Sequence, residues 1–268
     1  MASPHRSYLF VPGDRPERFA KACASGAHAV IVDLEDAVAP ERKVAARAAL
    51  ADWLNPERPV LVRINAADTA WFGEDCALAG RPGVAGIMLP KAERVDDLQA
   101  LRDAGAAAVL PLIETAVGFD QARALARAAG VQRLVFGSID FQLDLGIAGE
   151  DEELLAFRSG LVLASRLAGV AAPVDGVSTA IDDPARLAAD AACARRLGFG
   201  GKLCIHPRQV QVVNAAFSPS EADVRWATRV LEAAAAAGGA AIAVDGKMVD
   251  RPVLLRAQAV LAEAAQAP

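Results

Sequence analysis

The segment AVLPLIETAVGFDQARALARAAGVQRLVFGSID, residues 108–140, contains two apolar, strand-like runs that each lead to a carboxylate. The first run ends on Glu114 and the second, after a helix-like stretch, ends on Asp140. In a parallel barrel, strands joined by one helix are neighbours, and their carboxyl ends meet at the same mouth. Two carboxylates there, with water and substrate completing the octahedron, suit Mg²⁺. The segment therefore predicts parallel βα units and an enzyme.

The same alternation of short apolar runs and longer helix-like stretches continues along most of the chain. Runs that are apolar on both faces are typical of buried parallel strands. They are SYLFV (7–11), AVIVD (29–33), VLVRI (60–64), GIMLP (86–90), AVLPLIE (108–114), RLVFG (133–137), AAPVD (171–175) and GKLCI (201–205). Several stretches between them open on Asp or Pro and close on Gly, as capped helices do. Eight strand–helix units predict an α/β fold, a (β/α)8 TIM barrel, more naturally than an open sheet.

A C-terminal extension follows the predicted barrel. We expect residues 1–217 to form the catalytic barrel domain and residues 218–268 to pack on the barrel mouth or on a neighbouring subunit. Residues 218–238 predict a helix capped by Ser218 or Ser220. The pair Asp245-Gly246 predicts a hairpin turn, and Pro252 opens a last helix. The extension is therefore a helix–hairpin–helix element.

Composition excludes several classes of protein. The chain has 268 residues, of which 54% are hydrophobic and 23% charged, which is ample for a large core. A net charge of −5 argues against general binding to nucleic acids or anionic membranes. The four cysteines form no CxxC pair, and no signal peptide or membrane span is evident. We therefore expect a cytoplasmic protein with reduced thiols and no nucleic-acid or membrane partner.

Several further polar residues follow the predicted strands, and each has two interpretations. Arg63 suits a substrate carboxylate or a developing enolate oxygen, but it could simply pair with the acidic cluster Asp33–Asp36. Lys91 could be an ion-pair partner or a Schiff-base lysine. His206 precedes a proline that starts a helix, and a structural role is favoured over catalysis. Glu114 and Asp140 could themselves be salt-bridged or cap helices.

Eight motifs connect the chain to a known family. They are RSYLFVPGDRPERFAKA (6–22), VDLEDAV (32–38), VRIN (62–65), LPKAE (89–93), IETAVG (113–118), FGSIDF (136–141), GFGGKLCIHPRQV (198–210) and DGKMVDRP (245–252). In this order they resemble the citrate lyase β-subunit-like proteins of the HpcH/HpaI aldolase superfamily. The resemblance covers essentially the whole chain. It implies a (β/α)8 barrel, a homotrimer, and a Mg²⁺-dependent carbon–carbon lyase that acts on 3-hydroxyacyl thioesters.

The resemblance also assigns roles to individual residues. Glu114 and Asp140 would hold Mg²⁺, Arg63 would bind the 2-oxo acid fragment, and Asp250 would be a catalytic acid supplied by a neighbouring subunit. The other expected substrate contacts are Phe10 and Lys21 to the CoA portion, Val174 and Asp175 at the seventh strand, and Asp36 and Glu114 at the mouth. Phe10 stands where some relatives have tyrosine, so a hydroxyl hydrogen bond would be missing. The substrate would be an acyl-CoA or acyl-carrier thioester that releases a 2-oxo acid.

Several questions stay open from the sequence. The rival functions are a 2-oxo-acid aldolase without CoA, an acyl-CoA thioesterase and a non-catalytic subunit of a citrate lyase complex. The base that accepts the hydroxyl proton could be Asp175, Glu35 or Asp36. Asp250 could also serve only as the N-cap of the last helix.

Overall fold

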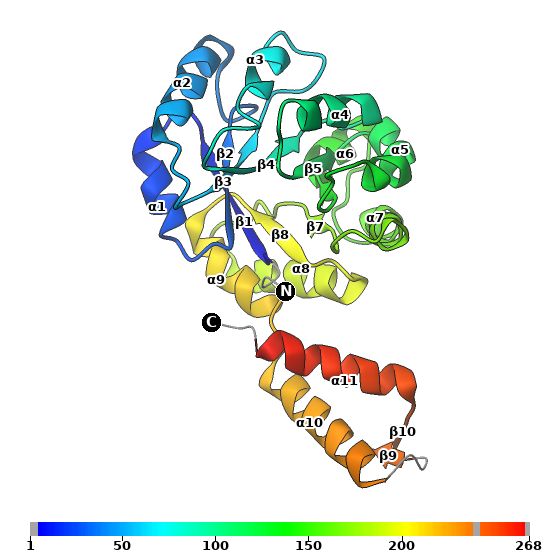
Figure 1. Ribbon diagram of the computed structural model, residues 1–268. Helices are drawn as coiled ribbons and strands as arrows, with labels where there is room; N and C mark the ends of the chain where they lie inside the picture. The colour runs from blue at the N-terminus through cyan, green and yellow to red at the C-terminus, as the bar shows by residue number, and fades with distance from the viewer. Residues whose placement is uncertain (1–4, 238–241, 266–268) are drawn as a thin grey trace. The chain divides into compact units, whose positions relative to one another are not determined.

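The computed structural model describes residues 5–237 and 242–265 (Figure 1). The chain forms two compact units: a barrel unit, His5–Asn214, and a C-terminal unit that begins at Ala215. Residues 1–4, 238–241 and 266–268, which belong to the predicted ranges 1–217 and 218–268, lie outside the described residues. The predicted division after residue 217 stays a prediction.

The barrel unit is a closed ring of eight parallel strands in chain order. They are β1 (Ser7–Pro12), β2 (Ala29–Asp33), β3 (Val60–Arg63), β4 (Val84–Leu89), β5 (Val109–Ile113), β6 (Val135–Phe136), β7 (Val174–Asp175) and β8 (Gly201–Cys204). The ring closes because β1 pairs in parallel with both β2 and β8. Each predicted apolar run contributes one strand, so the predicted TIM barrel is confirmed.

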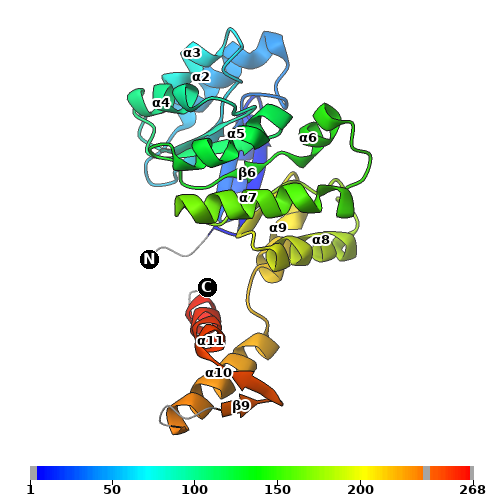
Figure 2. The same cartoon turned by 90° about the vertical axis from the view of Figure 1, so that its right-hand side faces the viewer.

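Helices cover the outside of this ring (Figure 1). They are α1 (Phe19–Cys23), α2 (Lys43–Trp53), α3 (Phe72–Cys76), α4 (Val95–Asp103), α5 (Ala116–Arg127), α6 (Ser138–Leu145), α7 (Leu155–Ala168), α8 (Pro184–Leu197) and α9 (Pro207–Ala216). Side-chain caps fix some of their starts: Thr115 Oγ1 accepts from Gly118 N at 3.0 Å, and Asp183 Oδ1 accepts from Arg186 N at 2.9 Å. Figure 2 shows α7 and α8 side by side on one flank of the barrel.

The interior of the barrel is filled by side chains. Residues from all eight strands form one cluster: Tyr8, Ile31, Leu61, Met88, Leu110, Leu112, Val135, Val174 and Leu203. Fully burying one large aliphatic side chain contributes about 1.5–3 kcal/mol, so this cluster is a major source of stability. Because the interior is packed, a ligand has room only at an end of the barrel.

The segment before Asp140 differs from the predicted strand. Strand β6 contains only Val135–Phe136, and Asp140 lies in the first turn of α6. Gly137 ends the strand, and its carbonyl accepts the Phe141 N–H at 3.0 Å, which starts the helix. The carboxylate of Asp140 is therefore presented by a helix start, where the helix dipole favours a negative charge. The prediction that a strand runs up to Asp140 is wrong.

The C-terminal unit contains α10 (Glu221–Ala236), β9 (Ile242–Val244), β10 (Lys247–Val249) and α11 (Arg251–Ala264). Ser220 caps α10 in a capping box with Asp223, which decides between the two predicted caps. Asp245 and Gly246 adopt φ values of 52° and 74°, as a tight hairpin turn requires. The two helices pack along each other, and the predicted helix–hairpin–helix element is confirmed. Among the described residues, no helix is long and apolar enough to cross a membrane.

Candidate active site

A cavity of about 400 Å³ opens among the carboxyl ends of the barrel strands. Five of the predicted site residues line it together: Phe10, Asp36, Arg63, Glu114 and Asp140. Apolar walls with a few converging charged groups are typical of a substrate site. A second cavity, of about 350 Å³, lies between α7 and α8 and shares Ser138, Ile139 and Val177 with the first. The first cavity is the candidate active site, because the predicted metal ligands and Arg63 line it.

Arg63, the last residue of β3, is held by a bidentate ion pair at the cavity wall. Its Nε and Nη2 donate to the two carboxylate oxygens of Asp33 at 2.7 and 2.6 Å, and its Nη1 lies 2.9 Å from Glu35 Oε2. Burial lowers the pKa of Arg63, but the adjacent carboxylate of Asp33 outweighs this effect, so the guanidinium is always charged. The Phe10 ring lies 4.8 Å from the guanidinium and supports it from one side.

The segment 33–36, here called the acid loop, is folded around the Asp33 side chain. Asp33 accepts the backbone N–H of Glu35 at 2.9 Å and of Ala37 at 3.1 Å, in addition to both bonds from Arg63. Arg63 therefore does pair with the acidic cluster, and it also lines the cavity; its binding of substrate stays a prediction. Two of its five guanidinium N–H donors serve Asp33, which leaves others for Glu35 and a ligand.

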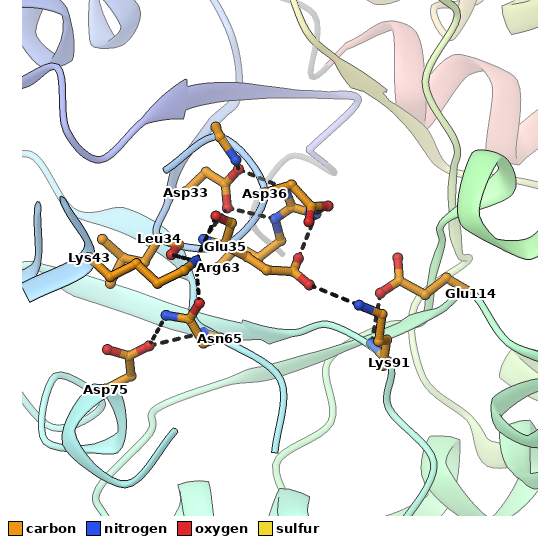
Figure 3. A network of polar contacts seen from close by, with 11 residues as sticks. Asp33, Leu34, Glu35, Asp36, Lys43, Arg63, Asn65, Asp75, Lys91 and Glu114 are labelled. Carbon is orange, nitrogen blue, oxygen red and sulfur yellow. Dashed lines mark hydrogen bonds and ion pairs between the residues drawn. The ribbon is translucent and has the colours of Figure 1, made fainter. Parts of the chain in front are cut away.

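Glu114 follows β5 directly and lies almost completely buried, with 2% of its surface exposed. Its Oε1 accepts the Lys91 backbone N–H at 2.8 Å. Lys91 adopts a φ of 45°, a left-handed conformation that is strained for this residue and frequent at functional sites. The Lys91 ammonium lies 3.6 Å from Glu35 Oε1, as an ion-pair partner would (Figure 3). The acid loop and Glu114 are thus linked through one lysine.

The environment of Glu114 fits a divalent cation. Burial, with a further contribution from the charge of Glu35, raises the pKa of its carboxyl to about 8. Within the described residues, Glu114 forms no ion pair, so a bound cation would supply the missing positive charge. No group of three or more His, Cys, Asp and Glu residues that could hold a metal occurs there either. Two carboxylates with the remaining ligands from water and substrate is the arrangement that Mg²⁺ accepts.

Gly137 makes room for the Glu114 carboxylate. A Cβ at this position would lie 2.5 Å from Glu114 Oε2 and 2.6 Å from Glu114 Cβ. We expect Gly137→Ala to displace Glu114 and to weaken Mg²⁺ binding about 10- to 100-fold, as changes around metal ligands typically do. Calorimetric titration with Mg²⁺ measures the effect. Gly73→Ala is the matched control, because its added Cβ meets no atom within 4 Å apart from its chain neighbours and the backbone of its own helix. Unchanged Mg²⁺ affinity in Gly137→Ala would contradict the assignment of Glu114.

Three predicted contact residues lie away from the cavity. Val174 is fully buried in the barrel core, and Asp175 is 1% exposed. Lys21 is exposed on α1 and does not line the cavity. The substrate contacts of these residues stay predictions.

His206 has a structural contact, because its Nδ1 accepts the Arg208 backbone N–H at 3.2 Å. The sequence did not single out Ile205, the residue before it, which lines the cavity.

Asp175 forms a buried charge cluster below the mouth. Its carboxylate accepts hydrogen bonds from Lys202 Nζ at 3.1 Å and from Arg158 Nε at 3.0 Å. Burial alone would raise the pKa of Asp175, but these two cations outweigh burial and hold the pKa below its usual value. The stability that this group contributes is therefore present above the unfolded pKa of about 3.9 and is lost as the pH falls below it.

We expect Asp175→Asn to lower the free energy of unfolding at pH 7 by about 3–5 kcal/mol, because Lys202 would be left buried without its counter-charge. Denaturant unfolding measures this loss. Asp182→Asn is the control: its pair with Arg208 is exposed, and the expected change is within about 1 kcal/mol. The difference between the two variants should shrink as the pH is lowered below about 4. Equal stability of both variants at pH 7 would contradict the interpretation.

Asp250 lies in the C-terminal unit, between β10 and α11. Its Oδ1 accepts the Val253 backbone N–H at 3.1 Å, which makes it the N-cap of α11. The capping role suggested by the sequence is thus confirmed. Its role as a catalytic acid stays a prediction.

Comparison with known proteins identifies the family. Residues 6–207 match the HpcH/HpaI aldolase/citrate lyase family. The chain belongs to this family. A citrate lyase subunit beta-like protein from Deinococcus radiodurans is 39% identical over 97% of this chain and 97% of its own length. A (3S)-malyl-CoA thioesterase from Cereibacter sphaeroides is 37% identical over 98% of this chain and 95% of its own length.

Solved structures of this family include close matches to the fold. CitE from Mycobacterium tuberculosis, in complex with magnesium, acetoacetate and coenzyme A, superposes with a TM-score of 0.87. It shares 40% sequence identity, and the match covers 98% of each chain. The same protein has also been solved with magnesium and pyruvate, with a TM-score of 0.77 and 37% identity. The resemblance inferred from the motifs is therefore confirmed.

Proposed function

We propose that this chain is a Mg²⁺-dependent lyase that cleaves the carbon–carbon bond of a 3-hydroxyacyl thioester. The products are an acetyl thioester and a 2-oxo acid, and malyl-, citramalyl- and citryl-CoA represent the substrate class. The observation that carries the proposal is the buried Glu114 carboxylate, without a cationic partner among the described residues, in the same cavity as Arg63. The similarity to CitE, solved with magnesium and coenzyme A, supports it.

Glu114 and Asp140 would hold the metal at the cavity. When bound, Mg²⁺ supplies Lewis-acid polarisation of the substrate's hydroxyl and carboxylate oxygens. Glu114 is pre-positioned for this task by the Lys91 backbone N–H and by the space at Gly137. Asp140 is presented by the first turn of α6.

Arg63 would bind the carboxylate or carbonyl of the 2-oxo acid fragment. Its guanidinium is already fixed by Asp33 before substrate arrives. A donor that needs no reorganisation stabilises developing oxyanion charge more effectively than a mobile one. The Phe10 ring under the guanidinium excludes water from one face, in addition to its proposed contact with the CoA portion.

Proton transfers would be divided between the mouth and the C-terminal unit. Among Asp175, Glu35 and Asp36, only Asp36 lines the cavity. We therefore assign Asp36 the contact with substrate and the role of the base that accepts the hydroxyl proton. Asp175 is committed to Lys202 and Arg158 and is a poor base for that reason. Asp250 of a neighbouring subunit would protonate the enolate carbon in cleavage or abstract that proton in condensation.

This division of labour requires an oligomer, and we propose a homotrimer in the cytoplasm. All four cysteines, Cys23, Cys76, Cys193 and Cys204, are free thiols, as is usual for a reducing compartment. Lys21, exposed on α1, is available for the proposed contact with the CoA portion, and Val174 and Asp175 would support the substrate site from below.

A thioesterase is the second candidate function, because a (3S)-malyl-CoA thioesterase is among the similar proteins. Both reactions consume the same thioesters, so consumption of the substrate does not separate them. The products differ, because only the lyase releases a 2-oxo acid. An aldolase without CoA and a non-catalytic subunit of a larger lyase are the remaining alternatives.

A substrate screen tests the proposal. Malyl-, citramalyl- and citryl-CoA and the corresponding free acids are incubated with the protein and Mg²⁺, and the released 2-oxo acid is identified. We expect release from one or more thioesters, at least about 10³-fold faster than from the free acids, because binding of the CoA portion contributes to transition-state stabilisation. We also expect loss of release in excess chelator. Release from the free acids at the same rate would favour the aldolase. No turnover without added partner subunits would favour the non-catalytic subunit.

A further inference from the structure

A buried polar network lies behind the acid loop, away from the cavity (Figure 3). Its centre is Lys43, the first residue of α2, which is only 7% exposed. Its Nζ donates to Leu34 O at 2.9 Å, to Glu35 O at 2.9 Å and to Asn65 Oδ1 at 2.6 Å. An ammonium has three N–H donors, so these oxygens occupy all of them.

The network continues to a second helix. Asp75 Oδ2 accepts the backbone N–H of Asn65 at 3.0 Å and its side-chain Nδ2 at 2.6 Å, so the Asn65 amide oxygen faces Lys43. Asp75 Oδ1 in turn accepts Arg47 Nε at 2.6 Å. The Trp71 ring lies 5.1 Å from Lys43 Nζ and covers the ammonium. Lys43, on α2, is therefore held by Asn65, which follows β3. Asn65 is in turn held by Asp75 of α3.

The two carbonyls bound by Lys43 belong to the acid loop that holds Arg63. Leu34 follows Asp33, the bidentate partner of Arg63, and Glu35 carries the second carboxylate beside the guanidinium. Asn65, the third partner, lies two residues after Arg63 on the same chain segment. Lys43 thus connects the backbone next to Asp33 with the side chain of Asn65, two residues after Arg63. Burying an ammonium among neutral oxygens is costly, and a Met of similar length would fill the space without that cost.

We propose that Lys43 is a positioning residue that sets the orientation of the Arg63 guanidinium by fixing the acid loop. Lys43 does not line the cavity, so it acts only through other residues. A shift of about 1 Å in a substrate-positioning group lowers rates about 10²-fold, so a small movement of the loop has a measurable effect. The inference rests on the proposed role of Arg63 in binding a 2-oxo acid.

Direct binding of pyruvate tests the inference without turnover. Lys43→Met, Lys43→Arg and the control Arg42→Met are compared by calorimetric titration with pyruvate in saturating Mg²⁺. Arg42 is the adjacent cation, but it is half exposed and pairs with Asp14 outside the network. We expect Lys43→Met to weaken pyruvate binding about 10- to 100-fold, with Mg²⁺ affinity unchanged. Arg42→Met should stay within about twofold of the wild type.

Lys43→Arg is a second variant that tests the inference even if Lys43→Met does not fold. It restores the buried charge, but a planar fork does not reproduce the three donors of the ammonium, so pyruvate binding should stay weak. Wild-type pyruvate affinity in Lys43→Arg, or in a folded Lys43→Met, would overturn the inference.

A double-mutant cycle shows whether the effect passes through Arg63. In the Arg63→Met background, Lys43→Met should weaken pyruvate binding by less than about twofold, because the group that it positions is gone. Equal weakening in both backgrounds would show that Lys43 acts on the site by another route, and would overturn the inference.

A spectroscopic measurement separates failure of this inference from failure of the proposed function. The Arg63 Nε–H resonance, assigned by its loss in Arg63→Met, should exchange slowly with solvent in the wild type. We expect exchange at least about tenfold faster in Lys43→Met and unchanged exchange in Arg42→Met. If the wild type binds no pyruvate, the proposed role of Arg63 fails, and the exchange rates still decide the positioning role. Unchanged exchange in Lys43→Met overturns it.

Discussion

Glu114→Gln is expected to lower kcat by at least about 10³-fold, equivalent to about 4 kcal/mol of transition-state stabilisation, because one of the two metal ligands is lost. The amide oxygen of glutamine can still accept the hydrogen bond from the Lys91 backbone N–H, because this bond does not require a charged acceptor. The fold should therefore persist, and the loss should appear both in turnover and in calorimetric Mg²⁺ titration.

Asp120→Asn is the matched control for Glu114→Gln, because Asp120 is an exposed acid on α5, the helix that follows Glu114. It should retain wild-type turnover and Mg²⁺ affinity. Full activity of Glu114→Gln, or full activity of the wild type in excess chelator, would show that the cavity does not work through a metal at Glu114.

Asp250→Asn is expected to lower turnover about 10²- to 10⁴-fold, the range typical of a general acid or base. Because asparagine also caps helices well, α11 should remain folded, and unfolding temperatures should match the wild type. Asp245→Asn, in the turn of the preceding hairpin, is the control; its exposed pair with Arg229 is the only contact at stake among those described. Wild-type turnover of Asp250→Asn would limit Asp250 to its capping role.

Mixing variants tests whether Asp250 serves a neighbouring subunit. Glu114→Gln and Asp250→Asn proteins are denatured, combined in equal amounts and refolded together. In the mixture, Glu114 is intact in about half of the subunits and Asp250 in the other half. If each site joins the barrel of one subunit to Asp250 of another, about a quarter of the sites therefore regain both residues. Absence of recovered activity in refolded oligomers would show that each site is built within one subunit.

Much of the fold was predictable because a parallel barrel leaves a strong pattern. Strands buried on both faces need continuous apolar runs, and each of the eight runs became a strand. The stretch before Asp140 was less predictable, since Gly137 and Ser138 end a strand and start a helix within two residues. A run of apolar residues does not reveal where such a change occurs. The sequence therefore predicts a strand up to Asp140, whereas the structure has Asp140 in the first turn of α6, still lining the cavity at the mouth.

The candidate site was predictable in its residue types more than in its contacts. Glu114, Arg63 and Asp140 follow from the rule that barrel strands carry functional groups at their carboxyl ends. The sequence offered the acidic cluster Asp33–Asp36 as a partner of Arg63, but the choice of Asp33 and the contacts of Lys43 did not follow, because hydrogen bonds between separate loops depend on tertiary packing. Lys43 looks like an ordinary surface lysine at the start of a helix, and only the structure shows that it is buried.

Product stoichiometry with the wild-type protein and Mg²⁺ tests the central claim most directly. The preferred thioester from the substrate screen is consumed, and the 2-oxo acid, acetyl-CoA and free CoA are measured together over the first turnovers. A lyase that breaks the carbon–carbon bond predicts one acetyl-CoA for each 2-oxo acid, with free CoA absent and no products in excess chelator. Free CoA released together with the intact hydroxy acid, in place of a 2-oxo acid, would contradict the account and assign thioester hydrolysis instead.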